Sequence, residues 1–216
     1  MIALHVEAVS GHYGVPGQVS QGATRHTLPV VPPSTVQGFL ESFVGASYRT
    51  FEGAFAYGRI RPPTGRGLIL RQAHVWASPR SVKENKRARD AVRARGVWVS
   101  GGKESRGDRE GTRTIKIETL IDPSYCILVD GPWESRVRAA LDGKGDCYGV
   151  LYLGESSDIV HWVGEMLDPT DQVEWLVPGT EMVLPTKAAR GYHNMDSTYG
   201  TFDLRVGRPA WMGGSK

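Results

Sequence analysis

Two adjacent prolines followed by a serine constrain the fold of this chain more than any other feature. Pro32 and Pro33 cannot continue a helix, and they hold the backbone before them extended. Ser34 follows directly, and together with Gln37 it matches a capping box, the pattern that begins a helix. The sequence therefore predicts extended backbone that turns at Ser34 into a helix over about residues 35–48.

One face of this helix is apolar. Its apolar residues recur at the helical spacing i, i+3, i+4, i+7 and i+8, at Val36, Phe39, Leu40, Phe43 and Val44. We expect these side chains to be core residues. Gly38 and Gly45 leave two bare points on the helix where another backbone or a phosphate can come close.

The start of the helix is a candidate anion site. The first amides of a helix have no partners within it, and the positive end of the helix dipole lies there. A basic pair, Arg25 and His26, lies just upstream. We expect this region to bind phosphate groups through Arg25, His26, Ser34, Thr35, Gln37 and Gly38. Ser34 and Gln37 have an ordinary structural explanation as well, since most capping boxes bind no ligand.

Positive charge is concentrated in one stretch. Residues 80–116 carry twelve Lys/Arg against five Asp/Glu, a net charge of +7, whereas the remaining 179 residues carry −4. A weakly acidic body with one basic projection indicates an anionic partner that is held at a defined place.

The basic stretch has the pattern of a β-hairpin. Residues 97–99 and 112–121 are β-like, and the glycine-rich segment 101–111 between them has the composition of a loop tip. Four basic residues at spacings of about three to four lie on or beside this tip, namely Lys103, Arg106, Arg109 and Arg113. They could contact RNA or simply be solvated, and Trp98 could pack or stack on a base.

The remaining patterns predict an α+β fold. Strands are predicted at residues 2–9, 55–60, 68–77, 125–130 and 148–153 and in the tail near 172–177, 181–184 and 201–206, and helices at 133–141 and after Ser156 or Ser157. The order strand, helix, strand, strand, helix, strand is typical of a ferredoxin-like or RRM-type layer. We expect such a domain at 1–160, with the basic hairpin inserted as a thumb at about 80–118. We expect a small, mostly β C-terminal extension at 161–216.

Several classes of protein do not fit the composition. No window is apolar enough to span a membrane, and the N-terminus alternates like a strand rather than a secretory signal, so we expect a cytoplasmic protein. The six histidines and two cysteines lack metal-ligand spacing. No P-loop, Rossmann glycine fingerprint or Gly-x-Ser-x-Gly elbow occurs. We expect neither a metal nor another cofactor.

The proline-rich motif is similar to that of a known family. The sequence TLPVVPPSTVQGFL, which starts at Thr27, resembles the N-terminal motif of CRISPR-associated protein family five, a family of RAMP proteins. Two weaker stretches follow in the expected order, LIDPSYCILV from Leu120 and YLGESSDIV from Tyr152. Spaced along the chain in this order, the three stretches extend the resemblance over about residues 2 to 160.

The resemblance implies a subunit of a type I, Cascade-like interference complex. Such a subunit caps the 5′ handle of the CRISPR RNA and contacts the backbone (family seven) subunits and the large (family eight) subunit, and through them target DNA. The glycine-serine loop adds Gly154 and Ser156 as candidate RNA contacts, although this loop could be only a turn. A single-stranded handle needs charge, amide donors and stacking surfaces from its holder.

An enzyme is the main alternative. Some members of the family cut precursor CRISPR RNA without a metal, using a tyrosine, a lysine and a histidine. Tyr48 could serve as the tyrosine, but Lys116 is followed by Ile117 rather than by a histidine. We therefore expect a non-catalytic subunit. A third possibility is an assembly protein whose basic thumb contacts a protein neighbour.

Overall fold

The computed structural model describes ten parts of the chain. They are residues 1–14, 24–47, 51, 55–61, 68–76, 112–147, 149–154, 158–168, 172–187 and 198–207. The chain divides into two compact units, the first formed by residues 1–18, 26–69 and 119–216 and the second by residues 19–25 and 70–118.

The first unit has a β-α-β-β-α-β core. Its elements in chain order are β1 (Ile2–Ala8), α1 (Pro33–Phe43), β4 (Phe55–Ile60), β7 (Ser124–Val129), α3 (Trp133–Leu141) and β8 (Val160–Glu165). The strands lie in the order β4-β7-β1-β8, and each neighbouring pair is antiparallel. This is the ferredoxin-like arrangement, so the predicted α+β class is confirmed. Two further strands, β9 (Val173–Lys187) and β10 (Thr198–Val206), extend the sheet beyond β4.

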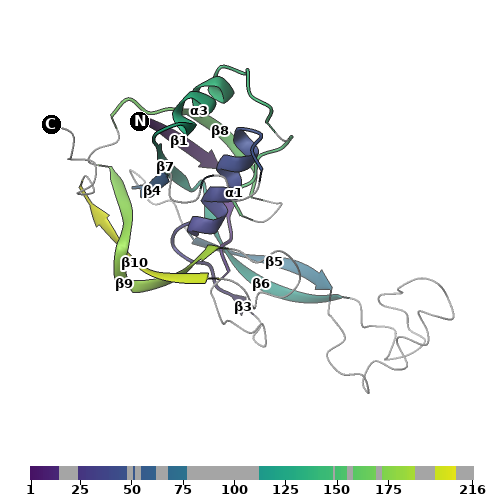
Figure 1. The fold of residues 1–216 in the computed structure, drawn as a ribbon. Coiled ribbons are helices and arrows are strands. Elements are labelled where there is room, and N and C mark those ends of the chain that lie inside the picture. Colours follow the sequence, from purple (N-terminus) through teal and green to yellow (C-terminus); the bar gives the residue numbers. More distant parts are fainter. Residues whose placement is uncertain are drawn as a thin grey trace. The chain divides into compact units, whose positions relative to one another are not determined.

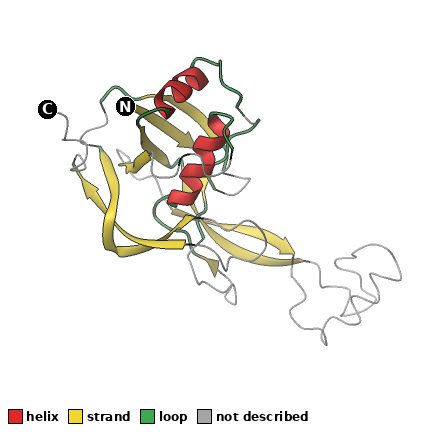
Figure 2. Ribbon diagram, viewed as in Figure 1, coloured by secondary structure: helices red, strands yellow, loops and turns green. Residues whose placement is uncertain are grey.

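The two helices cover one face of this sheet (Figures 1 and 2). Alternation places Ile2, Leu4 and Val6 of β1 on that face, where they are buried. Phe39 of α1 and Val137 of α3 belong to the same apolar cluster. The apolar face predicted for the first helix is therefore confirmed as core.

The second unit contains the strands of the basic region. β3 (Thr24–Arg25) pairs in parallel with β6 (Thr112–Ile121), and β5 (Leu68–Trp76) also pairs with β6. The last three residues of β6 belong to the first unit, where Leu120 and Ile121 pair with β2 (Ser10–Gly11). The predicted strands at 68–77 and 112–121 are confirmed, whereas the other predicted arm at 97–99 and the tip at 101–111 lie outside the described residues.

The first helix ends earlier than the sequence predicts. It stops at Phe43, and Gly45 follows in the left-handed region with φ of 62°. The N–H group of Ala46 donates to the carbonyl of Glu41, which closes the helix end. A side chain at Gly45 would also collide with the backbone carbonyl of Asp146. Gly45 thus ends the helix rather than baring part of its surface.

The segment after Gly149 differs most from expectation. The predicted strand at 148–153 is reduced to a single bridge between Tyr152 and Ile159, and the predicted helix carrying Val160 and Val163 is the strand β8. Short apolar runs do not distinguish helix from strand. Here pairing with β1, with Val6 opposite Val163, decides in favour of the strand.

The two predicted tail strands near 172–177 and 181–184 are one strand, β9. Pro178 and Gly179 read as a break in the sequence, but the ladder continues across an irregularity in the register. The carboxylate of Asp203 on β10 occupies this place and accepts hydrogen bonds from the N–H groups of Thr180 and Glu181, at 2.7 and 2.9 Å. Within the described parts of the chain, no helix is long and apolar enough to cross a membrane.

Candidate functional site

The backbone of the proline-rich motif is fixed on both sides before the helix begins. The N–H group of Tyr13 donates to the hydroxyl of Thr27, and the N–H group of Leu28 donates to the carbonyl of Tyr13, both at 2.8 Å. Further along, the buried hydroxyl of Tyr57 donates to the carbonyl of Val31 at 2.6 Å. The backbone of the motif is therefore held at Thr27, Leu28 and Val31 within the first unit.

The helix start is built by prolines rather than by serine. The N-cap is Pro32, extended at φ −66° and ψ 149°, and Pro33 is the first helical residue. Its fixed φ suits this position, and its missing N–H is not needed there. Ser34 consequently lies inside the first turn, and no side chain caps the helix. The predicted capping box is wrong.

This start offers fewer free amides than expected. The N–H groups of Thr35 and Val36 both donate to the carbonyl of Pro32, at 3.0 and 3.1 Å. Pro33 has no N–H group at all. A phosphate at this place would depend on the amide of Ser34 and on side chains. The predicted amide cradle is thus much weaker than the sequence indicates.

Two other predicted contact residues on α1, Gln37 and Gly38, differ in their exposure. Gln37 is buried, and its amide nitrogen donates to Glu41 at 3.0 Å, so this side chain supports the helix. Gly38 is partly exposed, and an added Cβ would meet nothing within 4 Å. Glycine inside a helix costs about 1 kcal/mol relative to alanine. No contact within the described residues explains this glycine.

The remaining predicted site residues are distributed over both units. His26 is exposed in the first unit, and Arg25 is partly exposed in β3 of the second. Arg113 lies in β6, but its side chain is outside the described residues. The other residues outside the described parts of the chain are Trp98, Lys103, Arg106, Arg109, Ser156 and Tyr48.

Gly154 has a structural explanation. Its φ of 138° is a conformation that other residues rarely adopt, and an added Cβ would lie 2.5 Å from a carboxylate oxygen of Asp158. Asp158 is fully buried and accepts hydrogen bonds from the hydroxyl of Ser10 and the N–H group of His12, at 2.9 and 3.1 Å. The glycine makes room for this carboxylate, which joins two loops.

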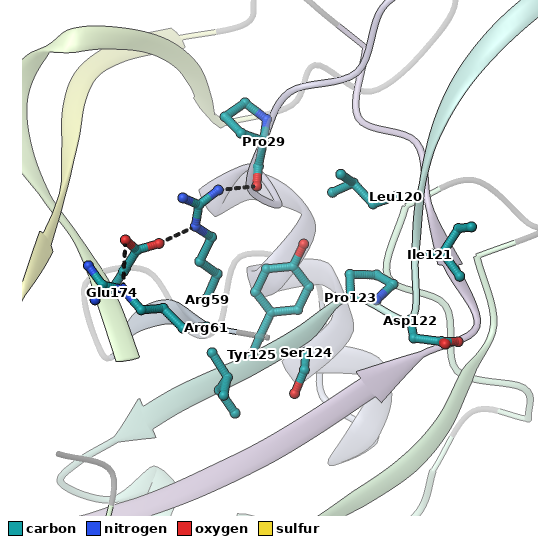
Figure 3. Close-up of a pocket in the computed structure, with 11 residues that line it drawn as sticks. Pro29, Arg59, Arg61, Leu120, Ile121, Asp122, Pro123, Ser124, Tyr125 and Glu174 are labelled. Atoms are coloured by element: carbon teal, nitrogen blue, oxygen red, sulfur yellow. Dashed lines mark hydrogen bonds and ion pairs between the residues drawn. The ribbon is translucent and has the colours of Figure 1, made fainter. Parts of the chain in front are cut away.

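A cavity of about 440 Å³ lies beside the proline-rich motif, entirely within the first unit (Figure 3). Its polar side is formed by Arg59 of β4 and by Arg61, which directly follows β4, with Glu174 of β9 between them. The Nε atoms of the two arginines lie 2.5 and 3.0 Å from the two oxygens of Glu174. Arg59 also donates to the carbonyl of Pro29 at 3.4 Å, which links the cavity to the motif.

Glu174 is ionised near neutral pH. Burial alone would raise its pKa, but hydrogen bonds from Arg59 and Arg61 and their charges lower the pKa below the ordinary value of 4.5. The three side chains therefore carry a net positive charge.

The opposite side of the cavity is mostly apolar. The end of β6 supplies Leu120 and Ile121, the β6–β7 connection supplies Pro123, and the exposed Asp122 lies beside them. The ring of Tyr125 lies between the two sides (Figure 3). Its hydroxyl donates to the hydroxyl of Tyr13 at 3.2 Å, and burial raises its pKa, so the phenol is neutral.

Sequence reasoning missed Arg59, Arg61 and Glu174. Arg59 lies in the predicted strand at 55–60 and Arg61 directly follows it, so in extended backbone their side chains share a face, and this spacing was the available signal. Glu174 is 115 positions away from Arg59, and only the pairing of β4 with β9 brings the two together. Among the described residues, no group of three His, Cys, Asp or Glu could hold a metal ion.

No family model matches this chain, and no curated protein matches its sequence. A solved structure described as a CRISPR RNA-guided surveillance complex contains a similar chain. The similarity covers 97% of this chain and 91% of that chain, at a TM-score of 0.58 and 17% identity. This likeness shows a shared fold.

Two further structures are similar at lower scores. A crystal structure of a Cas protein matches at a TM-score of 0.49 and 12% identity, over 95% of this chain and 93% of that chain. A cryo-EM structure of the type III-B Cmr-beta bound to cognate target RNA and AMPPnP matches at 0.40 and 11%, over 78% and 64%.

Proposed function

We propose that this chain is a subunit of a CRISPR RNA-guided surveillance complex that binds and caps the 5′ handle of the guide RNA. The observation that carries the proposal is the fold likeness to a chain of such a complex over 97% of this chain. The proline-rich motif, which resembles that of CRISPR-associated protein family five, supports the more specific role. Hydrogen bonds fix its backbone, and His26 is exposed at its start.

The charge distribution suits RNA. A single-stranded handle presents phosphates and unstacked bases along a curved path. Residues 80–116 carry a net charge of +7 that can neutralise such a backbone, and the exposed His26 and partly exposed Arg25 add donors beside the motif. In this role the chain contacts backbone subunits of family seven and the large subunit of family eight, and it meets target DNA only through them.

The subunit is proposed to be non-catalytic. Cleavage without a metal needs general acid and base groups that converge on the 2′-hydroxyl and the leaving oxygen. In the cleaving members of the family a histidine follows the lysine, but here Lys116 is followed by Ile117. The Ile117 side chain is 3% exposed and packs as a core residue. A core position cannot present an acid or a base to RNA.

Co-expression tests the proposal. The chain is produced with a CRISPR array and the neighbouring genes, purified through a tag, and the RNA that comes with it is sequenced. We expect a complex that contains guide RNAs with one uniform 5′ end. Recovery of the chain without other subunits and without guide RNA would refute the assignment.

Incubation of the purified chain with labelled repeat RNA in EDTA tests the enzymatic alternative. A non-catalytic subunit leaves the RNA intact, whereas a discrete product that disappears on Lys116→Ala would identify a metal-independent endoribonuclease. The matched control is Arg136→Ala, purified through the same tag, because it removes an exposed cation on α3 instead of Lys116. A product from a contaminating nuclease would appear with both variants.

A further inference from the structure

The cavity beside the motif has no role in the function proposed above. We propose that it holds one unstacked nucleotide of single-stranded RNA, with the phosphate on Arg61 and the base against the apolar wall at Leu120 and Pro123. This inference rests on the proposed function, since the nucleotide would belong to the RNA that the subunit caps. The volume of about 440 Å³ lies in the range of small-molecule sites, which is about 300–1,000 Å³.

Arg61 is the group that can receive a phosphate. Its Nε atom donates to the carboxylate of Glu174, and its backbone N–H group donates to the backbone carbonyl of Gln172 at 2.7 Å. Within the described parts of the chain, the two terminal nitrogens of its guanidinium make no hydrogen bond or ion pair, and the side chain is 53% exposed. These nitrogens offer the planar, paired donors that suit a phosphate.

Glu174 fixes this guanidinium in place. Its carboxylate lies between Arg59 and Arg61 and is itself only 16% exposed. Arg59 is fixed a second time by the carbonyl of Pro29. One carboxylate and two guanidiniums leave a net positive charge, so the site attracts an anion. The arginine side chains are already held in place before the anion binds. Such preorganisation lowers the cost of ordering on binding.

The other wall suits a flat, uncharged group. Pro123 is buried, and Leu120 and Ile121 are partly buried, so they form a firm apolar surface rather than a solvated one. Tyr125 and Asp122 border this surface, and a carboxylate such as that of Asp122 accepts hydrogen bonds. A base offers an apolar face together with N–H donors at its edge, and a ribose offers a hydroxyl.

The apolar wall favours a nucleotide over an acidic side chain of a protein partner. A bare carboxylate could reach Arg61, but it would leave the apolar wall at Leu120 and Pro123 uncovered. A nucleotide combines an anion for the guanidinium with a base for the wall. The cavity therefore matches the two ends of a nucleotide.

A thermodynamic cycle between protein and RNA tests the inference. The full-length chain is titrated with the handle RNA that co-purifies with it, using a series in which each position in turn is abasic. The proteins compared are wild type, Arg61→Ala, Arg61→Lys and Arg136→Ala. Arg136 is an exposed arginine on α3 that lies 4.8 Å from the centre of the Trp133 ring and does not line the cavity.

We expect Arg61→Ala to weaken binding of intact handle by about tenfold, the loss of one charge-assisted contact. The slope of log affinity against log salt should fall by about 0.7, the value for one phosphate of a single strand. One abasic position should weaken binding to wild type and have a much smaller effect on Arg61→Ala. Arg61→Lys should recover part of the affinity, and Arg136→Ala should match wild type.

The experiment distinguishes a failure of the proposed function from a failure of the inference about the cavity. If wild type does not bind handle RNA, the proposed function is wrong and the inference falls with it. If wild type binds but Arg61→Ala binds with the same affinity and salt slope, the inference alone is wrong. Loss of a co-purifying protein subunit from the Arg61→Ala complex, at unchanged RNA affinity, would assign the cavity to a protein partner and also overturn the inference.

Discussion

The hydrogen bond from Tyr57 to the carbonyl of Val31 is the anchor of the proline-rich motif that is easiest to remove. Tyr57→Phe deletes only the hydroxyl and keeps the aromatic ring in the core, where Tyr57 is 3% exposed. The carbonyl of Val31 accepts this bond at 2.6 Å, and Val31 is fully buried. Water cannot easily replace the lost donor.

The expected cost follows from this burial. A buried acceptor that loses its partner costs about 1–3 kcal/mol, and the lower part of that range, about 1–2 kcal/mol, applies to a neutral pair. For a chain of 150–250 residues, each kcal/mol lowers the melting temperature by about 2–4 °C, so we expect a decrease of about 2–8 °C. Burial raises the pKa of Tyr57 well above 10, so the donor stays protonated and the cost should not vary with pH around neutrality.

Urea unfolding followed by circular dichroism measures this difference, with thermal melting as a second assay. The matched control is Tyr199→Phe, because Tyr199 is 46% exposed in β10 and its change should stay within about 0.5 kcal/mol of wild type. If Tyr57→Phe is no less stable than Tyr199→Phe, the hydroxyl does not anchor the motif, and the account of how the motif is held is wrong.

Four other substitutions test single steps of the account. Ser34→Ala should change the stability by less than about 0.5 kcal/mol in urea unfolding, because Ser34 is not the cap, whereas a true N-cap would cost about 1 kcal/mol. Gly38→Ala should stabilise the isolated chain by about 1 kcal/mol in the same assay, and it should also weaken handle binding if RNA or a partner approaches that helix face. Gly154→Ala should lower the melting temperature through its collision with Asp158 and its φ of 138°, and an unchanged melting temperature would contradict this packing. The pKa of Glu174 is lowered in the folded state, so the stabilisation by its carboxylate is complete above the ordinary pKa of 4.5. This stabilisation is lost as the pH falls through the lower folded-state pKa. Glu174→Gln should therefore flatten the acid side of the profile of stability against pH, measured by urea unfolding.

The α+β core was predictable because its elements follow local periodicity. β1 alternates, α1 repeats apolar residues at helical spacing, and β4 and β7 are short runs between turn residues. Each of these signals acts within a few residues, and the structure agrees with them wherever one candidate pattern dominates the local sequence.

The misses occurred where two local signals compete. At the start of α1, Pro33 and Ser34 are both good helix starters, and the proline wins because its fixed φ suits the first helical position. At β8, residues such as Val160 and Val163 fit a helix as well as a strand, and pairing with β1 decides. Pro178 resembles a break, but β9 continues past it.

The candidate site was only partly predictable because it depends on distant residues. The motif was found from its own sequence, but its anchors Tyr13 and Tyr57 are 14 and 26 positions from the atoms that they hold. The cavity joins β4, the β6–β7 connection and β9. Their side chains meet only after the sheet order is known, and no short-range pattern encodes that order.

Crosslinking of RNA to protein in the assembled complex tests the central claim most directly. The complex is irradiated with ultraviolet light, and the crosslinked peptides and nucleotides are identified by mass spectrometry. If this chain caps the guide, the nucleotides at the 5′ end of the RNA should crosslink to peptides that contain residues 25–38 and to those that line the cavity. Crosslinks of those nucleotides only to other subunits, or of this chain only to the 3′ part of the guide, would contradict the account.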